Sequence, residues 1–275
     1  MIKRAIFIIL ILSVAIFSSC ERRHKQDVLI LYPNWADGIA ITHLGKIILE
    51  EKGYSVTIKR LEPGPIFAAL SRGDADLYMD AWLPYTHKDY WDRYSNKLDT
   101  LGSVFKGGTT GLVVPTYVDI NSIEELNANK DKFGSKIYGI GVGAGIYFNT
   151  EKAIKEYNLQ LSQQPSSETS MVTALKKAIA NKEWIVITGW KPHFMWSNFN
   201  LKTLDDPKNT YPTDAIKIIT RKGFSSDKPE ITSILQKYTL SEDMLNELMV
   251  DVDKSSDPEI GAKIFYDKYK DILIQ

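Results

Sequence analysis

Three tryptophans lie where predicted strands give way to loops in this 275-residue chain. They are Trp35 after a strand over residues 28–32, Trp82 after one over 75–79, and Trp190 after one over 184–188. Each tryptophan alone could simply pack in a hydrophobic core or between two lobes of the protein. However, ligands in open α/β sheets bind outside the carboxyl ends of strands. Aromatic faces gathered there suit a quaternary ammonium, at roughly 0.5 to 2 kcal/mol for each ring.

Two further features could hold an anion. In the stretch Gly143-Ala-Gly-Ile146, glycines give way to a helical pattern, so the N–H groups of Gly145 and Ile146 could bind a small carboxylate. A tight turn without a ligand is the simpler interpretation, whereas a dinucleotide loop is disfavoured because the glycines fall inside the strand signal. His87, five residues after Trp82, either donates a hydrogen bond to such a carboxylate or caps a turn and starts a helix.

Composition excludes several classes of function. The chain has 34 basic and 34 acidic side chains, so nucleic acid is not an expected partner. No pair among its four histidines has metal-ligand spacing, and His43 is expected on a helix surface, so neither a metal nor another cofactor is predicted. A secreted hydrolase using His87 with Asp80 or Asp89 is a second hypothesis, which lacks a Gly-x-Ser-x-Gly nucleophile motif.

The N-terminus has the pattern of a secretory signal. A short basic start and an apolar run over residues 5–17 lead to two serines and Cys20, the only cysteine of the chain. This placement resembles a bacterial lipoprotein signal, so we predict a signal peptide over 1–19 and a polar tether over 20–27, with Cys20 lipidated. A plain signal peptide or an uncleaved anchor helix are the alternatives. All three place the rest of the chain outside the cytoplasmic membrane.

Strand and helix signals alternate over the remainder, which predicts mostly parallel sheets flanked by helices. Two such blocks are expected, with lobe I formed by residues 28–110 and 218–275 and lobe II by residues 111–217. The terminal helices have no strands of their own and should return to the first block. The chain would then cross twice between the lobes and leave a cleft between them.

Five stretches together resemble the glycine betaine-binding proteins of ABC importers. They are Asn34-Trp-Ala-Asp-Gly-Ile-Ala40, Gly64-Pro-Ile-Phe67, Asp80-Ala-Trp-Leu-Pro-Tyr-Thr-His-Lys88, Gly143-Ala-Gly-Ile146 and Thr188-Gly-Trp-Lys-Pro-His193. The resemblance implies the two-lobed periplasmic-binding-protein fold (type II) and a monomeric, non-enzymatic protein. It also implies delivery of glycine betaine, with proline betaine a second possible ligand, to a membrane permease driven by an ATPase.

Carried over by position, the resemblance implies a ligand set. Trp35, Trp82 and Trp190 would form an aromatic prism around the trimethylammonium. His87 and the N–H groups of Gly145 and Ile146 would bind the carboxylate. The chain departs from the family at Phe194-Met-Trp196, where the family often has Trp-Met-Phe, which leaves the preference among bulkier betaines open. A sensor module that reports to a receptor, instead of a permease, would have the same sequence features.

Overall fold

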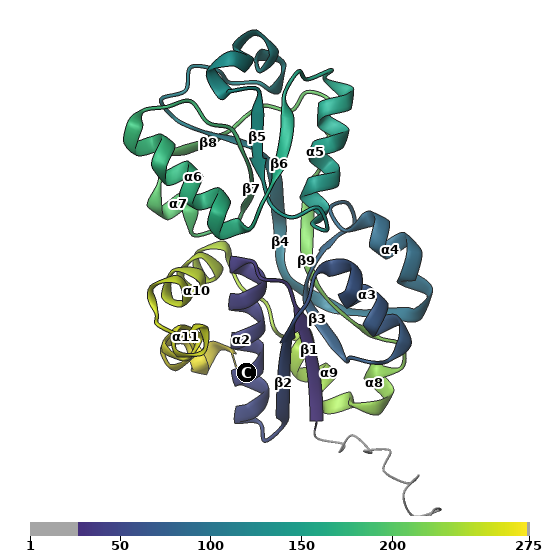
Figure 1. Cartoon of the computed structure of the whole chain (residues 1–275). Coiled ribbons are helices and arrows are strands. Elements are labelled where there is room, and N and C mark those ends of the chain that lie inside the picture. Colours follow the sequence, from purple (N-terminus) through teal and green to yellow (C-terminus); the bar gives the residue numbers. More distant parts are fainter. Residues whose placement is uncertain (1–26, 274–275) are drawn as a thin grey trace, which may run out of the picture.

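The computed structural model describes residues 27–273, and the predicted signal peptide, Cys20 and nearly all of the tether lie outside this range. Figure 1 shows two lobes, one above the other, with long strands passing between them. The strands are β1 (Asp27–Tyr32), β2 (Ser55–Arg60), β3 (Leu77–Leu83), β4 (Leu98–Pro115), β5 (Lys136–Gly139), β6 (Ser162–Pro165), β7 (Ile187–Lys191), β8 (Leu201–Thr203) and β9 (Asp214–Arg221).

Helices cover both faces of the sheets. The α-helices are α2 (Ala36–Glu51), α3 (Pro63–Arg72), α4 (Lys88–Tyr94), α5 (Gly145–Glu156), α6 (Glu168–Asn181), α7 (Met195–Asn198), α8 (Phe224–Asp227), α9 (Pro229–Gln236), α10 (Glu242–Lys254) and α11 (Pro258–Leu273). Short 3-10 helices are η1 (Ser95–Lys97), η2 (Ile123–Glu125) and η3 (Asn127–Phe133). None of these helices, within residues 27–273, is long and apolar enough to cross a bilayer.

The strand order β2-β1-β3-β9-β4-β7-β5-β6, with β8 beside β4, joins both lobes through β4. In lobe I, β1 pairs in parallel with β2 and β3, whereas β9 runs antiparallel to β3 and β4. In lobe II, β5 pairs in parallel with β6 and β7, whereas β4 runs antiparallel to β7 and β8. The predicted α/β fold is confirmed, and its sheets are mixed because β4 and β9 oppose their neighbours.

Strand β4 changes its partner where it passes from one lobe to the other. It pairs with β9 up to Gly108 and with β7 from Thr109 onward. This change supports the limit that the sequence predicts near residue 110. Strand β9 pairs with β4 from Asp214 onward and with β3 from Ala215 onward. We retain 28–110 with 218–275 and 111–217 as the proposed extents of lobes I and II.

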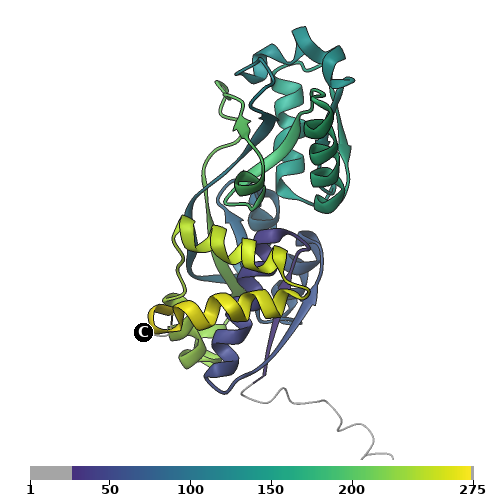
Figure 2. The ribbon, with the colours of Figure 1, turned by 90° about the vertical axis from the view of Figure 1, so that its left-hand side faces the viewer.

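The C-terminal helices return to lobe I, as the sequence predicts. Helices α10 and α11 pack against α2 and against each other, and Figure 2 shows them lying across that side of the lobe. The apolar faces of these helices supply buried side chains that include Leu245, Leu248 and Phe265. His43, on α2, is only 6% exposed, so its predicted place on a helix surface was wrong, because α2 is buried on several sides.

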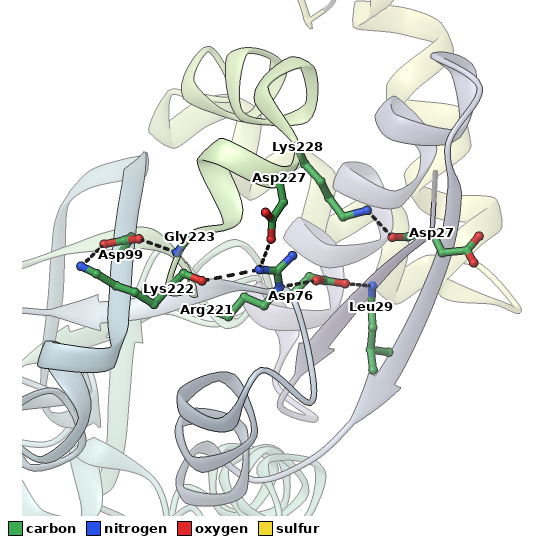
Figure 3. Close-up of polar contacts among 9 residues, drawn as sticks. All are labelled: Asp27, Leu29, Asp76, Asp99, Arg221, Lys222, Gly223, Asp227 and Lys228. Carbon is green, nitrogen blue, oxygen red and sulfur yellow. Dashed lines mark hydrogen bonds and ion pairs between the residues drawn. The ribbon is translucent and has the colours of Figure 1, made fainter. Parts of the chain in front are cut away.

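A network of charged side chains fixes the end of lobe I that lies away from lobe II (Figure 3). The Arg221 Nε donates to the Asp76 Oδ1 at 2.9 Å, and its Nη1 donates to Asp227 at 2.6 Å. The other oxygen of Asp76 accepts the backbone N–H of Leu29 at 2.9 Å. The network therefore joins β1, the residue before β3, the end of β9 and α8.

Candidate ligand-binding site

The structure brings all six predicted ligand-binding residues to one cavity between the lobes. The empty space among its lining residues, including the part that is open to solvent, measures about 290 Å³. The lining consists of Trp35, Asp37, Trp82, Thr86, His87, Thr110, Ile140, Ala144, Gly145, Ile146 and Trp190. Its largely apolar, aromatic walls with a few polar groups are typical of a site for a small organic molecule.

Two of the tryptophans lie inside strands, so the predicted strand ends were wrong. Strand β3 continues through Trp82, which pairs with Ile216 of β9 after a register shift that follows Tyr78. Strand β7 continues through Trp190, which pairs with Thr110 of β4. In both cases an antiparallel neighbour from a distant part of the chain lengthens the strand. Trp35 lies just before α2 and occupies its N-cap position.

Trp82 is fixed by two buried carboxyl groups that the sequence analysis did not assign to the site. Its indole Nε1 donates to the Asp37 Oδ2 and to the Asp80 Oδ1, both at 3.0 Å. Burial, followed by the nearby charge of Asp37, raises the pKa of Asp80 well above its ordinary value. Burial and the charge of Glu168 also raise the pKa of Asp37. Both carboxyl groups therefore bind a proton more readily than exposed ones do, and both accept from the same indole N–H.

His87 lies in the cavity as a neutral hydrogen-bond donor. Its ring is 1% exposed, and its Nδ1 accepts the backbone N–H of Trp82 at 3.0 Å, so the ring proton is on Nε2. Burial lowers the pKa of His87 to about 3. Asp214 fixes the preceding turn by accepting the N–H groups of Tyr85 and Thr86 at 2.7 and 2.9 Å.

Helix α5 begins at Gly145, so the N–H groups of Gly145 and Ile146 belong to its first turn and have no partner within the helix. A side chain at position 145 would not fit, because a Cβ there would lie 2.0 Å from the carbonyl oxygen of Thr86. This glycine thus allows the two lobes to approach each other backbone to backbone. Tyr90 of α4 adds a second contact between the lobes by donating to the Gly143 carbonyl at 2.9 Å.

Four buried hydrogen-bonding atoms of the described lining residues lack a protein partner. They are the Oδ1 of Asp37, the hydroxyl groups of Thr86 and Thr110 and the indole Nε1 of Trp190. The backbone carbonyl of Trp190 accepts the indole N–H of Trp196 at 2.8 Å, so the departure at Phe194-Met-Trp196 lies directly behind the cavity. Unpartnered buried polar atoms are rare, and here they face a space that a polar ligand could fill.

The geometry does not support hydrolysis at His87. Its Nδ1 is occupied by a backbone N–H, Asp80 bonds to Trp82 and Asp89 is exposed. No cluster of three or more histidine, cysteine or acidic side chains suited to a metal ion occurs within residues 27–273. Two lobes that enclose an aromatic cavity between them are the arrangement of the two-lobed solute-binding proteins.

Comparison with known proteins places the chain within this class. The family model for the substrate binding domain of ABC-type glycine betaine transport systems (OpuAC) matches residues 26–268. The chain belongs to this family, which comprises solute-binding proteins of ABC transporters and not enzymes. The hydrolase hypothesis was therefore wrong, and the resemblance drawn from the five sequence stretches is confirmed.

Similar proteins are found by sequence and by structure. A glycine betaine/carnitine transport binding protein (GbuC) of Listeria monocytogenes is 43% identical over 149 residues, which span 52% of this chain and 50% of that protein. Lactococcal OpuAC, in a closed form with glycine betaine, is 33% identical with a TM-score of 0.85, covering 91% of this chain and 100% of that one. A Borrelia burgdorferi glycine betaine/L-proline-binding protein (ProX) is 33% identical with a TM-score of 0.87, covering 90% and 95%.

Proposed function

We propose that this chain captures glycine betaine outside the cytoplasmic membrane and delivers it to an ABC transporter as an osmoprotectant. The observation that carries the proposal is the convergence of Trp35, Trp82 and Trp190 on one cavity that also contains hydrogen-bond donors suited to an anion. A zwitterion with a methylated ammonium and a carboxylate matches both halves of this lining.

At the cationic end, the three indole faces surround the trimethylammonium. This group cannot donate a hydrogen bond, so ring quadrupoles supply the attraction, roughly 0.5 to 2 kcal/mol from each ring. The Asp37–Asp80 pair fixes the Trp82 ring by accepting its Nε1–H.

At the anionic end, His87 and the first turn of α5 bind the ligand carboxylate. His87 donates from Nε2, since its Nδ1 already accepts the backbone N–H of Trp82. The N–H groups of Gly145 and Ile146 point from the positive end of the helix, where anions are favoured. The unpartnered hydroxyl of Thr86 is a further donor within the same lining.

Binding and closing of the lobes are coupled in this proposal. Trp35, Trp82 and His87 belong to lobe I, whereas Trp190 and the start of α5 belong to lobe II. A ligand that touches both sets binds the closed form more tightly than the open form and shifts the population toward it. The permease then receives the closed, loaded protein.

The partners and the location follow from the same proposal. The chain acts as a monomer with a permease and its ATPase, and lipidated Cys20 tethers it to the membrane. The family description and the similarity to glycine betaine-binding proteins support the transport role. The apolar run that ends in two serines and a lone cysteine supports the lipid anchor. Mass spectrometry of the mature N-terminus would show an acylated Cys20, and an unmodified or retained signal segment would contradict the anchor.

Calorimetry with glycine betaine, choline and glycine tests the ligand. Choline lacks the carboxylate and glycine lacks the methyl groups, so both should bind at least about 100-fold more weakly than glycine betaine, since each loses one set of contacts. Choline that binds as tightly as glycine betaine would remove the anionic half of the proposal. Proline betaine in the same series measures the tolerance of the cavity for a larger ring.

Tryptophan fluorescence gives an independent measurement. Glycine betaine should change the spectrum of the wild-type protein strongly, and Trp82→Ala should lose most of the binding. A wild-type spectrum that does not respond, together with no heat of binding, would reject the assignment of the ligand.

A further inference from the structure

The carboxylate of Glu168 accepts one hydrogen bond from each lobe. Its Oε2 accepts the backbone N–H of Ala36 at 2.9 Å, and its Oε1 lies 3.0 Å from the Nε2 of His193. Ala36 belongs to lobe I, whereas Glu168 and His193 belong to lobe II. The Nδ1 of His193 accepts the Met195 N–H at 3.0 Å, so the ring proton is on Nε2 and is donated to Glu168.

Glu168 completes the start of a helix in the opposite lobe. Ala36 is the first residue of α2, and its N–H has no acceptor within that helix. The N-cap residue of α2, Trp35, makes no side-chain capping bond. The positive end of α2 is therefore satisfied by a carboxylate from lobe II, a favourable arrangement that exists only while the lobes are together.

The capping of its own helix does not explain the position of Glu168. Helix α6 begins at Glu168, and the preceding Ser167 already caps it by accepting the Ser170 N–H at 3.1 Å. Glu168 is only 9% exposed, although acidic residues in a first helical turn are usually solvated. Its carboxylate lies where the lobes meet, so that Oε2 accepts from Ala36 of lobe I and Oε1 accepts from His193 of its own lobe.

The same contacts connect the aromatic walls of the two lobes. Ala36 directly follows Trp35 in the chain, and His193 packs edge-on against Trp190 with ring centroids 4.6 Å apart. A continuous path thus runs from Trp190 through His193, Glu168 and Ala36 to Trp35. Loss of its central bond would free the N-terminus of α2, and with it the position of the Trp35 ring relative to Trp190.

We infer that Glu168 is a positioning residue that holds the lobes closed and aligns Trp35 with Trp190 by bonding the N-terminus of α2 across the cleft. The inference rests on the proposed function for the identity of the ligand. The role of Glu168 in holding the lobes together does not depend on that identity. Glu168 does not line the cavity, so it acts through its neighbours and not by touching the ligand.

The substitution Glu168→Gln tests this role with little change in shape. An amide has one acceptor oxygen where the carboxylate has two, so either Ala36 or His193 loses its acceptor. The matched control is Glu151→Gln, which removes the same charge from lobe II. Glu151 is exposed and accepts the Gln163 Nε2 at 2.8 Å within that lobe.

Small-angle X-ray scattering, with and without glycine betaine, measures the closed fraction, and calorimetry measures the affinity. Glu168→Gln should lower the closed fraction under both conditions and raise the Kd for glycine betaine at least tenfold. Glu151→Gln should match the wild type, and Glu168→Ala should exceed the effect of Glu168→Gln. Circular dichroism checks that every variant is folded.

The outcomes distinguish the role of Glu168 in closing from the proposed ligand. An unchanged closed fraction and Kd in folded Glu168→Gln would overturn the inference, as would an equal loss in Glu151→Gln, which would assign the effect to charge alone. A wild-type protein that does not bind glycine betaine would reject the proposed ligand. A lower closed fraction of ligand-free Glu168→Gln would still support the closing role in that case.

Discussion

Gly145 provides the sharpest test of how the two lobes close, because one methyl group should block their approach. In the structure, a Cβ at position 145 would lie 2.0 Å from the carbonyl oxygen and 2.6 Å from the carbonyl carbon of Thr86. Ordinary contacts begin near 3.4 Å, so Gly145→Ala requires a separation of about 1.4 Å more.

Neither side of this contact can easily give way locally. The Thr86 backbone is held through its N–H by the buried carboxylate of Asp214, and Gly145 is part of the first turn of α5. Separating the lobes therefore costs less free energy than rearranging either backbone locally. The backbone N–H of residue 145 is retained in the alanine variant, so the substitution acts through space and not through the loss of a donor.

The cost to ligand binding follows from the contacts that lobe II would no longer make. One aromatic ring contributes roughly 0.5 to 2 kcal/mol, and each hydrogen bond to a charged group about 1.5 to 3 kcal/mol. Losing Trp190 and the two N–H groups of the α5 start should cost at least about 3 kcal/mol, which corresponds to a Kd raised by about 100-fold. The stability of the fold should be unchanged or slightly higher, because alanine restricts the unfolded chain more than glycine does.

Calorimetry and X-ray scattering with saturating glycine betaine measure the affinity and the closing. The matched control is Gly141→Ala in the same loop, where a Cβ would meet nothing within 4 Å. We expect the control to bind and close as the wild type does. A Gly145→Ala protein that also binds and closes normally would show that this backbone contact does not limit closing.

Three further predictions concern other contacts. Tyr90→Phe removes the hydrogen bond to Gly143 across the cleft and should raise the Kd about three- to tenfold in calorimetry; an unchanged Kd would make this contact irrelevant to closing. Burial lowers the pKa of His87 from 6.5 to about 3, so the unfolded chain binds more protons and stability falls as the pH is lowered. In urea titrations, the free energy of unfolding of the wild type should fall between pH 7 and pH 4.5, and about 2.5 kcal/mol of this fall should be absent in His87→Gln. A variant whose free energy of unfolding falls as much as that of the wild type would contradict neutral burial. Asp76→Asn weakens the bond to Arg221 and should cost about 2 kcal/mol in urea with the Kd unchanged; a change in affinity instead would argue against a purely structural network.

The sequence alone predicted most of the fold because its signals are local. Alternating apolar strands and amphipathic helices give the βα order, and the return of α10 and α11 to lobe I follows from their lack of further strands. The strand limits at Trp82 and Trp190 were wrong because β9 and β4 extend those strands by antiparallel pairing. Trp82 pairs with Ile216 and Trp190 with Thr110, and pairing between residues so far apart in the chain leaves no local pattern to detect.

The sequence also predicted six of the eleven residues that line the cavity, from aromatic types near strand ends and a glycine-rich helix start. It named Asp80 only in the hydrolase hypothesis, and it did not predict that Asp37 and Asp80 hold Trp82 or that Asp214 holds the turn before His87. Two of these follow a visible signal, since Asp37 and Asp80 each lie two positions from a tryptophan of the site. Asp214 carries no such signal, because it is 128 residues from the Thr86 N–H that it accepts.

What the sequence by itself determined is the set of chemical groups: three indoles, a histidine and free N–H groups at a helix start, within an α/β chain. Only the tertiary structure decided that these groups share one space, that Thr86 and Gly145 meet backbone to backbone, and that Glu168 bonds Ala36 of the other lobe. The physical reason is that residue type and spacing determine local conformation and donor chemistry. Contacts across a cleft depend instead on how two separately packed lobes are set against each other by β4 and β9.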